Sequence, residues 1–217
     1  MPNRQPAEGH TSHYFDAVPQ TSSALRTVEL VLPDLTVPLQ TDRSVFSGDR
    51  VDPGTRLLLL EAPAPPPSTR HALDLGCGYG PVALTLAHRA PQATVWALDV
   101  NERAVALCRA NAEALGATTV HASVVSEDRP TGEVPDDVRF DLVWSNPPIR
   151  IGKAALHALL TRWLDRLTPE GRAWLVVQRN LGADSLQRWL EAEGRPAERV
   201  SSRAGYRLLS VGAREGA

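Results

Sequence analysis

A loop of alternating glycines is the part of the sequence with the clearest chemistry. Gly76, Gly78 and Gly80 follow Asp74 in the stretch DLGCGYG, directly after an apolar run. Glycines between a strand and a helix let a ligand come close to the backbone. A dinucleotide-binding turn would need glycine at position 81, where Pro81 has no N–H to offer a pyrophosphate. Because Asp74 would also repel phosphate and attract a cation, the loop predicts a cofactor without phosphates.

A second acidic residue, Asp99, ends the next apolar run along the chain. At the tip of a neighbouring strand, its carboxylate can accept hydrogen bonds from a ribose diol, each worth about 1.5–3 kcal/mol. A glycine turn or a strand-end aspartate alone is ordinary turn and helix-cap chemistry. Their joint placement, in register with a strand, a helix and a second strand, favours the cofactor interpretation.

The tetrad Asn146-Pro147-Pro148-Ile149 could hold an amine in position for reaction. Its prolines stiffen the backbone and carry no N–H, so the main chain there presents acceptors. An exocyclic amine attacks a methyl group only when both of its N–H bonds are held aside. The Asn146 side-chain oxygen and the Pro147 carbonyl can hold them, and most of the rate would then come from positioning. In an arbitrary protein the same tetrad would be interpreted as a strand-terminating turn.

The elements that must position these residues follow from apolar runs and from chain breakers. The pattern predicts helices over 81–89, 102–115, 154–167 and 183–192, and strands over 71–75, 94–100, 118–125, 140–145, 172–178, 197–201 and 205–212. Strands that alternate with helices indicate an α/β fold with a doubly wound, mostly parallel sheet. The last two strands are too close in sequence for a parallel crossover, so we expect the sheet to close with an antiparallel edge strand.

A smaller unit is expected ahead of this pattern. β-Branched residues on both sides of Pro33-Asp34 predict a hairpin from Thr27, and GTRLLLLEA (54–62) predicts a short buried helix. The prolines of 63–67 would form a stiff linker. We therefore expect a flexible tail over 1–13, an N-terminal extension of hairpin, lid and linker over 14–68, and the main domain over 69–217.

Residues 74–80 and the stretch ALDVN at 97–101 resemble the first two motifs of class I S-adenosylmethionine (SAM)-dependent methyltransferases. The resemblance implies SAM as cofactor and a Rossmann-like sheet of seven strands with a reversed last hairpin. The residues it implies around SAM are Asp74, Gly76, Cys77, Gly78, Asp99, Val100, Asn101, Ala122, Ser123 and Asn146. Val124 stands where many relatives carry Asp or Asn to bond the adenine amine.

The tetrad is similar to the (Asn/Asp)-Pro-Pro-aromatic motif of enzymes that methylate an amine of adenine, guanine or glutamine. This implies catalytic roles for Asn146, Pro147, Pro148 and Ile149. Ile149 departs from the motif, because the aromatic residue that stacks on the target is absent. We expect weaker stacking, or help from one of the aromatic residues Phe46, Tyr14 and Phe15.

Longer stretches of the sequence resemble one group within this family. NPPIRIGK (146–153), FSGDRVDPGTRLLL (46–59) and HYF (13–15) resemble the small-domain methyltransferases that include the C-type ribosomal small-subunit RNA methyltransferase, which modifies guanine N2. The resemblance implies that the segment around Phe46 and Asp52 folds over SAM as a lid, and that the substrate is ribosomal RNA or the small ribosomal subunit. A protein glutamine, a DNA adenine, and a non-catalytic module that binds SAM or RNA remain the alternatives.

Charge limits how RNA could be held. The chain has 23 Lys and Arg against 25 Asp and Glu, a formal net charge of -2, so no global basic field attracts nucleic acid. Any contact must be regional, and Phe46, Arg150 and Lys153 are expected at the substrate rim. Arg43, Arg50 and Arg56 accompany the lid, although each cation alone is most simply a solvated charge.

The remaining features are plainer. Two cysteines without a CxxC pair exclude a disulfide scaffold and a structural zinc site on spacing grounds, and no metal is expected. The longest apolar run, 57–60, is far too short for a membrane span, and the first residues do not resemble a secretory signal. We expect a cytoplasmic protein that is a monomer or a homodimer.

Overall fold

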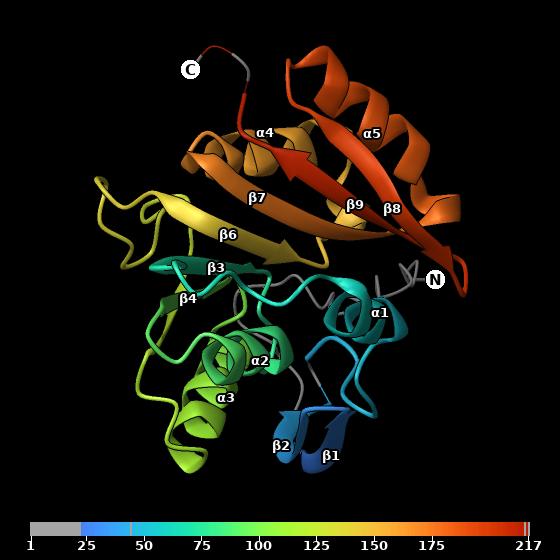
Figure 1. Ribbon diagram of the computed structural model, residues 1–217. Coiled ribbons are helices and arrows are strands. Elements are labelled where there is room, and N and C mark those ends of the chain that lie inside the picture. The colour runs from blue at the N-terminus through green and yellow to red at the C-terminus, as the bar shows by residue number, and fades with distance from the viewer. Residues whose placement is uncertain (1–22, 44, 215, 217) are drawn as a thin grey trace, which may run out of the picture.

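The computed structural model describes residues 23–43, 45–214 and 216. Its elements along the chain, shown in Figure 1, are β1 (Leu25–Leu32), β2 (Leu35–Asp42), α1 (Pro53–Glu61), β3 (His71–Leu75), α2 (Pro81–Arg89), β4 (Thr94–Asp99), α3 (Glu102–Ala114), β5 (Val120–Val124), β6 (Phe140–Ser145), η1 (Ile149–Ile151), α4 (Lys153–Leu164), β7 (Leu167–Gln178), η2 (Arg179–Leu181), α5 (Ala183–Ala192), β8 (Ala197–Arg203) and β9 (Tyr206–Gly212). The expected tail over 1–13, and the aromatic residues Tyr14 and Phe15, lie outside the described residues.

The main sheet has seven strands in the order β5-β4-β3-β6-β7-β9-β8. β3 pairs in parallel with β4 on one side and with β6 on the other, so the chain changes direction across the sheet between them. Ligands of doubly wound sheets bind at the carboxyl ends of the strands at such a switch point. The predicted α/β fold with a mostly parallel seven-stranded sheet and an N-terminal hairpin is confirmed.

The last strand, β9, is antiparallel as expected, but it does not lie at the edge. It pairs antiparallel with β7 on one side and with β8 on the other, which leaves β8 as the edge strand. Burial explains the order, since Leu208, Leu209 and Val211 of β9 are fully buried, whereas most of β8 is exposed. The more apolar strand takes the interior position.

β7 begins earlier than predicted, at Leu167, and α4 correspondingly ends at Leu164. The turn-like residues of 169–171 are accommodated by a register shift against β6 between Phe140 and Leu142. A Cβ at Gly171 would lie 2.6 Å from the Phe140 carbonyl oxygen, so only glycine fits beside β6 here.

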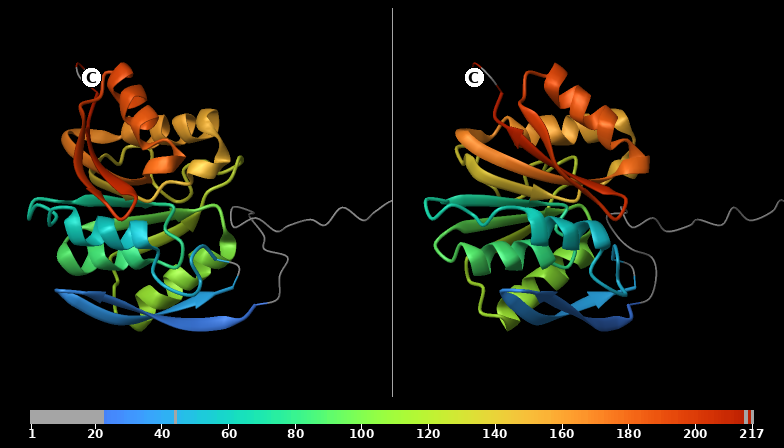
Figure 2. Two further views of the ribbon diagram at one scale, coloured as in Figure 1. Left: turned by 90° about the vertical axis from the view of Figure 1, so that its right-hand side faces the viewer. Right: turned by 45° about the vertical axis from the view of Figure 1, so that its right-hand side comes forward.

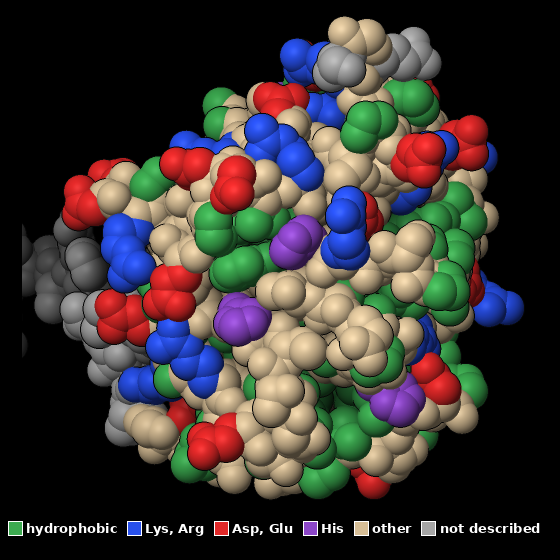
Figure 3. All heavy atoms as spheres, turned by 60° about the vertical axis from the view of Figure 1, so that its left-hand side comes forward, with side chains coloured by type: hydrophobic (Ala, Val, Ile, Leu, Met, Phe, Trp, Pro, Cys, Tyr) green, Lys and Arg blue, Asp and Glu red, His purple; other side chains and the backbone are tan. Residues whose placement is uncertain are grey.

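The helices form two layers. In Figures 1 and 2, α1, α2 and α3 cover one face of the sheet together with the β1–β2 hairpin, and α4 and α5 cover the other. The surface in Figure 3 carries interspersed acidic and basic side chains, in line with the small net charge. No helix of the described residues is long and apolar enough to cross a membrane.

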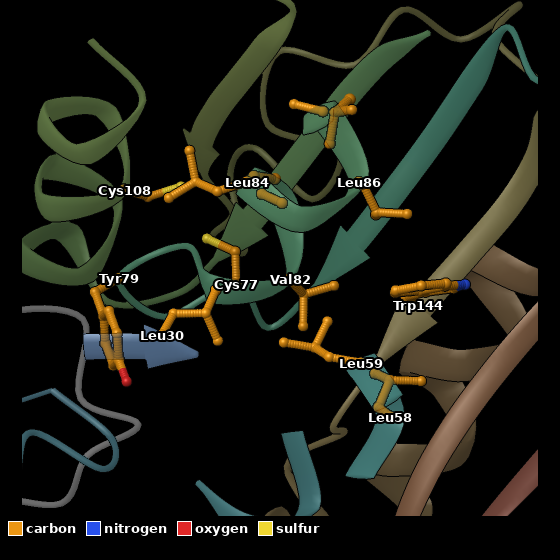
Figure 4. Close-up of a cluster of buried hydrophobic side chains, with 14 of the residues drawn as sticks. Leu30, Leu58, Leu59, Cys77, Tyr79, Val82, Leu84, Leu86, Cys108 and Trp144 are labelled. Carbon is orange, nitrogen blue, oxygen red and sulfur yellow. The ribbon is translucent and has the colours of Figure 1, made fainter. Parts of the chain in front are cut away.

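The hairpin and α1 share a hydrophobic core with the main sheet. Leu30 of β1 and Leu58 and Leu59 of α1 are buried in one cluster with Val82 of α2 and Trp144 of β6 (Figure 4). Burying a leucine side chain contributes about 1.5–3 kcal/mol. This shared core holds the segment between β2 and α1 against the carboxyl ends of the strands.

Candidate active site

The glycine loop lies between the end of β3 and the start of α2. The backbone N–H groups of Gly76 and Cys77 both donate to the carbonyl oxygen of Leu98, at 2.8 and 2.9 Å, which ties the loop to β4. Gly80 has φ of +101°, and a Cβ there would lie 2.9 Å from Cys108 Sγ on α3. The loop therefore has one shape, set by its neighbours on both sides.

Asp74 lies in β3, just ahead of this loop, and bonds the helix that follows the loop. Its side chain is 1% exposed, and Oδ2 accepts a hydrogen bond of 2.9 Å from the backbone N–H of Ala83 in the first turn of α2. Burial raises the pKa of Asp74 well above its ordinary value, although the Ala83 N–H acts in the opposite direction. Cys77 is also buried and points into the core (Figure 4). Of these two predicted residues, Asp74 holds the first turn of α2, and the side chain of Cys77 faces the core.

Asp99, at the tip of β4, links the loop to α3. Oδ2 accepts from the N–H of Gly78 at 2.9 Å, and Oδ1 accepts from the N–H of Asn101 at 2.9 Å. Burial raises the pKa of Asp99, while these N–H groups and that of Val100 lower it. Asn101 in turn caps α3 by accepting from the N–H of Arg103 at 3.0 Å. The predicted residues Asp99, Val100 and Asn101 thus form one turn beside the glycine loop.

The tetrad follows β6, next to β3. Ser145 Oγ donates to the Leu75 carbonyl oxygen at 2.6 Å, which ties the ends of the two strands together. Asn146 Nδ2 donates to Asp52 Oδ2 at 2.9 Å and to Thr55 Oγ1 at 3.1 Å. Sequence reasoning placed Asp52 in the lid but missed Thr55; the signal was the helix-capping spacing of the two residues.

These parts enclose a pocket at the carboxyl ends of β3 and β6. Its lining comes from the glycine loop, from Asn146 and from the segment ahead of α1, including Phe46, Asp52 and Thr55. Tyr79 also lines it, and its hydroxyl is buried without a hydrogen-bond partner among the described residues. Burial, and then the charge of Asp52, raise the pKa of Tyr79. The pocket lies at the switch point of the sheet, where β3 pairs with both β4 and β6.

Ala122 and Ser123 lie on β5, farther from the pocket. The Ala122 carbonyl accepts from Arg109 Nε at 2.7 Å, and Ser123 Oγ accepts from the Glu133 N–H at 3.1 Å. Ser123 is 2% exposed, so its side chain serves the loop that follows β5. Val124 pairs with Asp99 across the two strands. Any adenine contact from β5 would have to come from the main chain or from Val124.

The predicted rim residues are at the surface. Arg150 and Lys153 are exposed just beyond the tetrad, in η1 and at the start of α4, and Phe46 is 46% exposed beside the pocket. Arg43, Arg50 and Arg56 are also exposed. No cluster of three or more His, Cys, Asp or Glu side chains that could hold a metal occurs in the described parts of the chain.

Comparisons with known proteins agree with this arrangement. A family model described as methyltransferase small domain matches residues 36–210. The chain is 34% identical over 201 residues to the uncharacterized protein YbxB of Bacillus subtilis, covering 93% of this chain and 98% of that protein. It is 38% identical over 140 residues to ribosomal RNA small subunit methyltransferase C of Pseudomonas entomophila, covering 64% of this chain and 40% of that protein.

One solved structure similar to this chain is the T. thermophilus 16S rRNA N2 G1207 methyltransferase in complex with AdoMet and guanosine. The TM-score is 0.70 at 26% identity, covering 90% of this chain and 52% of that chain. The chain thus spans 40% of the Pseudomonas enzyme and about half of the T. thermophilus one. With most of its length matched by the family model, the chain belongs to the methyltransferase small domain family, as its glycine loop and Asn-Pro-Pro tetrad predicted.

Proposed function

We propose that this SAM-dependent methyltransferase transfers a methyl group to the exocyclic N2 amine of a guanine in ribosomal RNA. The family match supports methyl transfer from SAM, and the names of two relatives that act on ribosomal RNA support the substrate class. The observation that carries the proposal is the placement of Asn146, whose amide lies beside the glycine loop at the end of β6.

The glycine loop supports SAM as the ligand of this pocket. A Cβ built on Gly78 would meet no atom within 4 Å, and one on Gly76 would meet only the Asn146 carbonyl oxygen, at 3.9 Å, so the loop backbone is open to a ligand. Asp99 Oδ2 accepts from the Gly78 N–H and Oδ1 from the Asn101 N–H, and a carboxylate oxygen can accept more than one hydrogen bond. Asp99 would hold the ribose hydroxyls, and the backbone of Gly76, Cys77 and Gly78 would hold the methionine part.

The reacting amine would be held by the tetrad. When bound, SAM supplies an electrophilic methyl group on a sulfonium. Asn146 Oδ1 and the Pro147 carbonyl accept the two N–H bonds of the amine and leave its lone pair free for in-line attack. The Pro147 carbonyl already accepts from the Ile149 N–H at 2.8 Å and has one lone pair left for this task. The methylated nitrogen is cationic and loses a proton readily, so no strong general base is needed.

The rim would guide the RNA. We assign to Phe46 and Ile149 the faces that cover the target base, and to Arg150 and Lys153 contacts with phosphates. Phosphate contacts from exposed cations make binding depend on salt, and each one lost should reduce that dependence.

The proposal is tested with labelled SAM and small ribosomal subunits from cells that lack the gene. We expect incorporation into 16S rRNA and N2-methylguanosine on nucleoside mass spectrometry. Asn146→Ala should abolish transfer while SAM binding, measured by calorimetry, stays within about threefold. Gln92→Ala, which removes an exposed amide in the loop before β4, is the matched control and should retain full turnover.

Other outcomes would redirect the assignment. Transfer to release-factor glutamine or duplex DNA, with none to any RNA fraction, would refute the rRNA substrate and retain the tetrad chemistry. SAM binding with no transfer to any of these substrates would indicate a binding module. Full turnover in Asn146→Ala would refute the role of the amide itself.

A further inference from the structure

Asn146 has a fixed set of partners from the segment ahead of α1. Its Nδ2 donates to Asp52 Oδ2 at 2.9 Å and to Thr55 Oγ1 at 3.1 Å, so both amide protons have acceptors. No residue in the described parts of the chain donates to Asn146 Oδ1 in return. The amide therefore presents its oxygen, and not its nitrogen, to a ligand.

The chemistry of Asp52 explains this orientation. The two ends of an asparagine amide have nearly the same shape, so packing alone does not choose between them. An ionised carboxylate is only an acceptor, and turning Asn146 Oδ1 toward Asp52 would bring two acceptors together. A hydrogen bond to a charged group is also shorter and stronger than a neutral one. Asp52 therefore selects the amide orientation that an incoming amine requires.

Asp52 is itself held in place. It caps α1, because the same Oδ2 accepts from the Thr55 N–H at 2.9 Å. The start of the helix is packed against β9, since a Cβ on Gly54 would lie 2.6 Å from the ring of Tyr206. Because the start of α1 is held in this way, Asp52 keeps a fixed position relative to the Asn146 amide.

We propose that Asp52, assisted by Thr55, is a positioning residue that sets which end of the Asn146 amide faces the substrate amine. The inference rests on the amine-methylating role proposed above for Asn146. It makes the segment ahead of α1 part of the reaction geometry, beyond its expected role as a lid over the cofactor.

The first test reads the amide directly and needs no substrate. In ¹⁵N-labelled protein, the Asn146 side-chain NH2 signals are assigned by their loss in Asn146→Ala, and their hydrogen exchange is measured. Asp52→Ala should speed this exchange at least tenfold, whereas Asp52→Asn, whose side-chain oxygen can still accept, should speed it less. The control is Asp49→Ala. It removes an exposed acid that lies, like Asp52, in the segment ahead of α1 and that pairs with Arg26 of β1, and it should leave the exchange rate unchanged. Unchanged exchange in folded Asp52→Ala would overturn the inference.

The second test separates orientation from helix capping. Asn146→Asp places a carboxylate against Asp52 and should lower kcat at least a hundredfold. Adding Asp52→Asn should then recover at least tenfold, although Asp52→Asn alone lowers kcat. A residue that only caps α1 would give additive losses in this cycle, and additivity would overturn the inference.

The two proposals fail in different ways. If the unmodified protein methylates no ribosomal RNA, the proposed substrate is wrong, and the exchange measurement still decides the role of Asp52. If it methylates rRNA but the exchange and the cycle show no coupling, only the positioning role is wrong. Thermal unfolding of each variant confirms that the compared proteins are folded.

Discussion

At the scale of single residues, Asp99 connects the cofactor loop to the tip of β4 through the N–H groups of Gly78 and Asn101. Asp99→Ala should weaken SAM binding by roughly 10- to 100-fold, because a hydrogen bond to a charged group contributes about 1.5–3 kcal/mol. Calorimetry measures the change. Asp128→Ala, an exposed acid after β5, is the control and should bind SAM normally. Unaltered affinity in Asp99→Ala would show that the ribose lies elsewhere.

Ile149 is the second residue for which we predict a specific effect of substitution. Stacking of a base on an aromatic side chain contributes about 1–3 kcal/mol, and an isoleucine cannot supply it. Ile149→Phe should therefore lower KM for the RNA substrate about fivefold or more with little change in kcat. Ile151→Phe adds the same ring two residues later, at a position that is 36% exposed, and should have no such effect. Equal KM values in the two variants would contradict the assigned contact.

Which of these residues could be predicted depends on how local their signal is. Asp99 and Asn146 could be predicted because a polar residue at the end of an apolar strand lies at the ligand-binding edge of a parallel sheet. The contact between Asn146 and Asp52 joins segments 94 residues apart and has no local signal. Asp74 shows the converse limit, because an acid just before a glycine loop can face a ligand or, as here, hold the first turn of α2.

At the scale of elements, Arg89 joins the hairpin turn, α1 and α2. Its Nε contacts Asp34 at 2.7 Å, and its Nη1 donates at 2.8 Å to the Leu59 carbonyl, whose usual helical donor would be the N–H of Pro63, which proline lacks. Arg89→Ala should cost about 1–3 kcal/mol of unfolding free energy. Asp34→Ala should cost about 0–1 kcal/mol, since the Asp34 side chain is 40% exposed. Urea unfolding compares them, and equal losses would argue against the carbonyl cap.

The same ion pair predicts a pH dependence. The Arg89 hydrogen bond lowers the pKa of Asp34 from 3.8 to about 2. The folded state then holds the Asp34 proton more weakly than the unfolded state, so the stabilisation is present above pH 3.8 and is lost as the pH falls toward 2. The stability difference between the unmodified protein and Asp34→Asn should shrink across that window. A constant difference would show that the pair does not stabilise the fold.

Most elements could be predicted because apolar periodicity and chain breakers are local properties. The helices over 81–89 and 183–192 have the predicted bounds. The interior place of β9 and the early start of β7 depend instead on pairing between strands distant in sequence. In β7, the turn-like residues of 169–171 join the strand only because Phe140 pairs with Leu167 and a register shift follows.

At the scale of the whole molecule, the N-terminal extension and the main sheet share one buried cluster, so we expect them to unfold cooperatively. We propose an extension over 14–68 and a main domain over 69–217 as regions of the sequence, and the buried cluster includes described residues of both. Leu39 of the hairpin and Leu58 of α1 are fully buried in the same cluster as Leu86 of α2. The proposed orientation of the Asn146 amide depends on this shared core, because Asp52 contacts Asn146 from the start of α1.

Two neighbouring leucines of α1 test this cooperativity. Leu59 is fully buried, whereas Leu60 is 45% exposed. Leu59→Ala should cost about 2–5 kcal/mol, and Leu60→Ala about 0.5 kcal/mol or less. Because the core is shared, each variant should unfold in one transition that far-UV and near-UV circular dichroism report alike, the latter through buried Trp144. An extension that folded independently would instead show an earlier transition of its own in Leu59→Ala, with the near-UV signal of the main sheet unchanged.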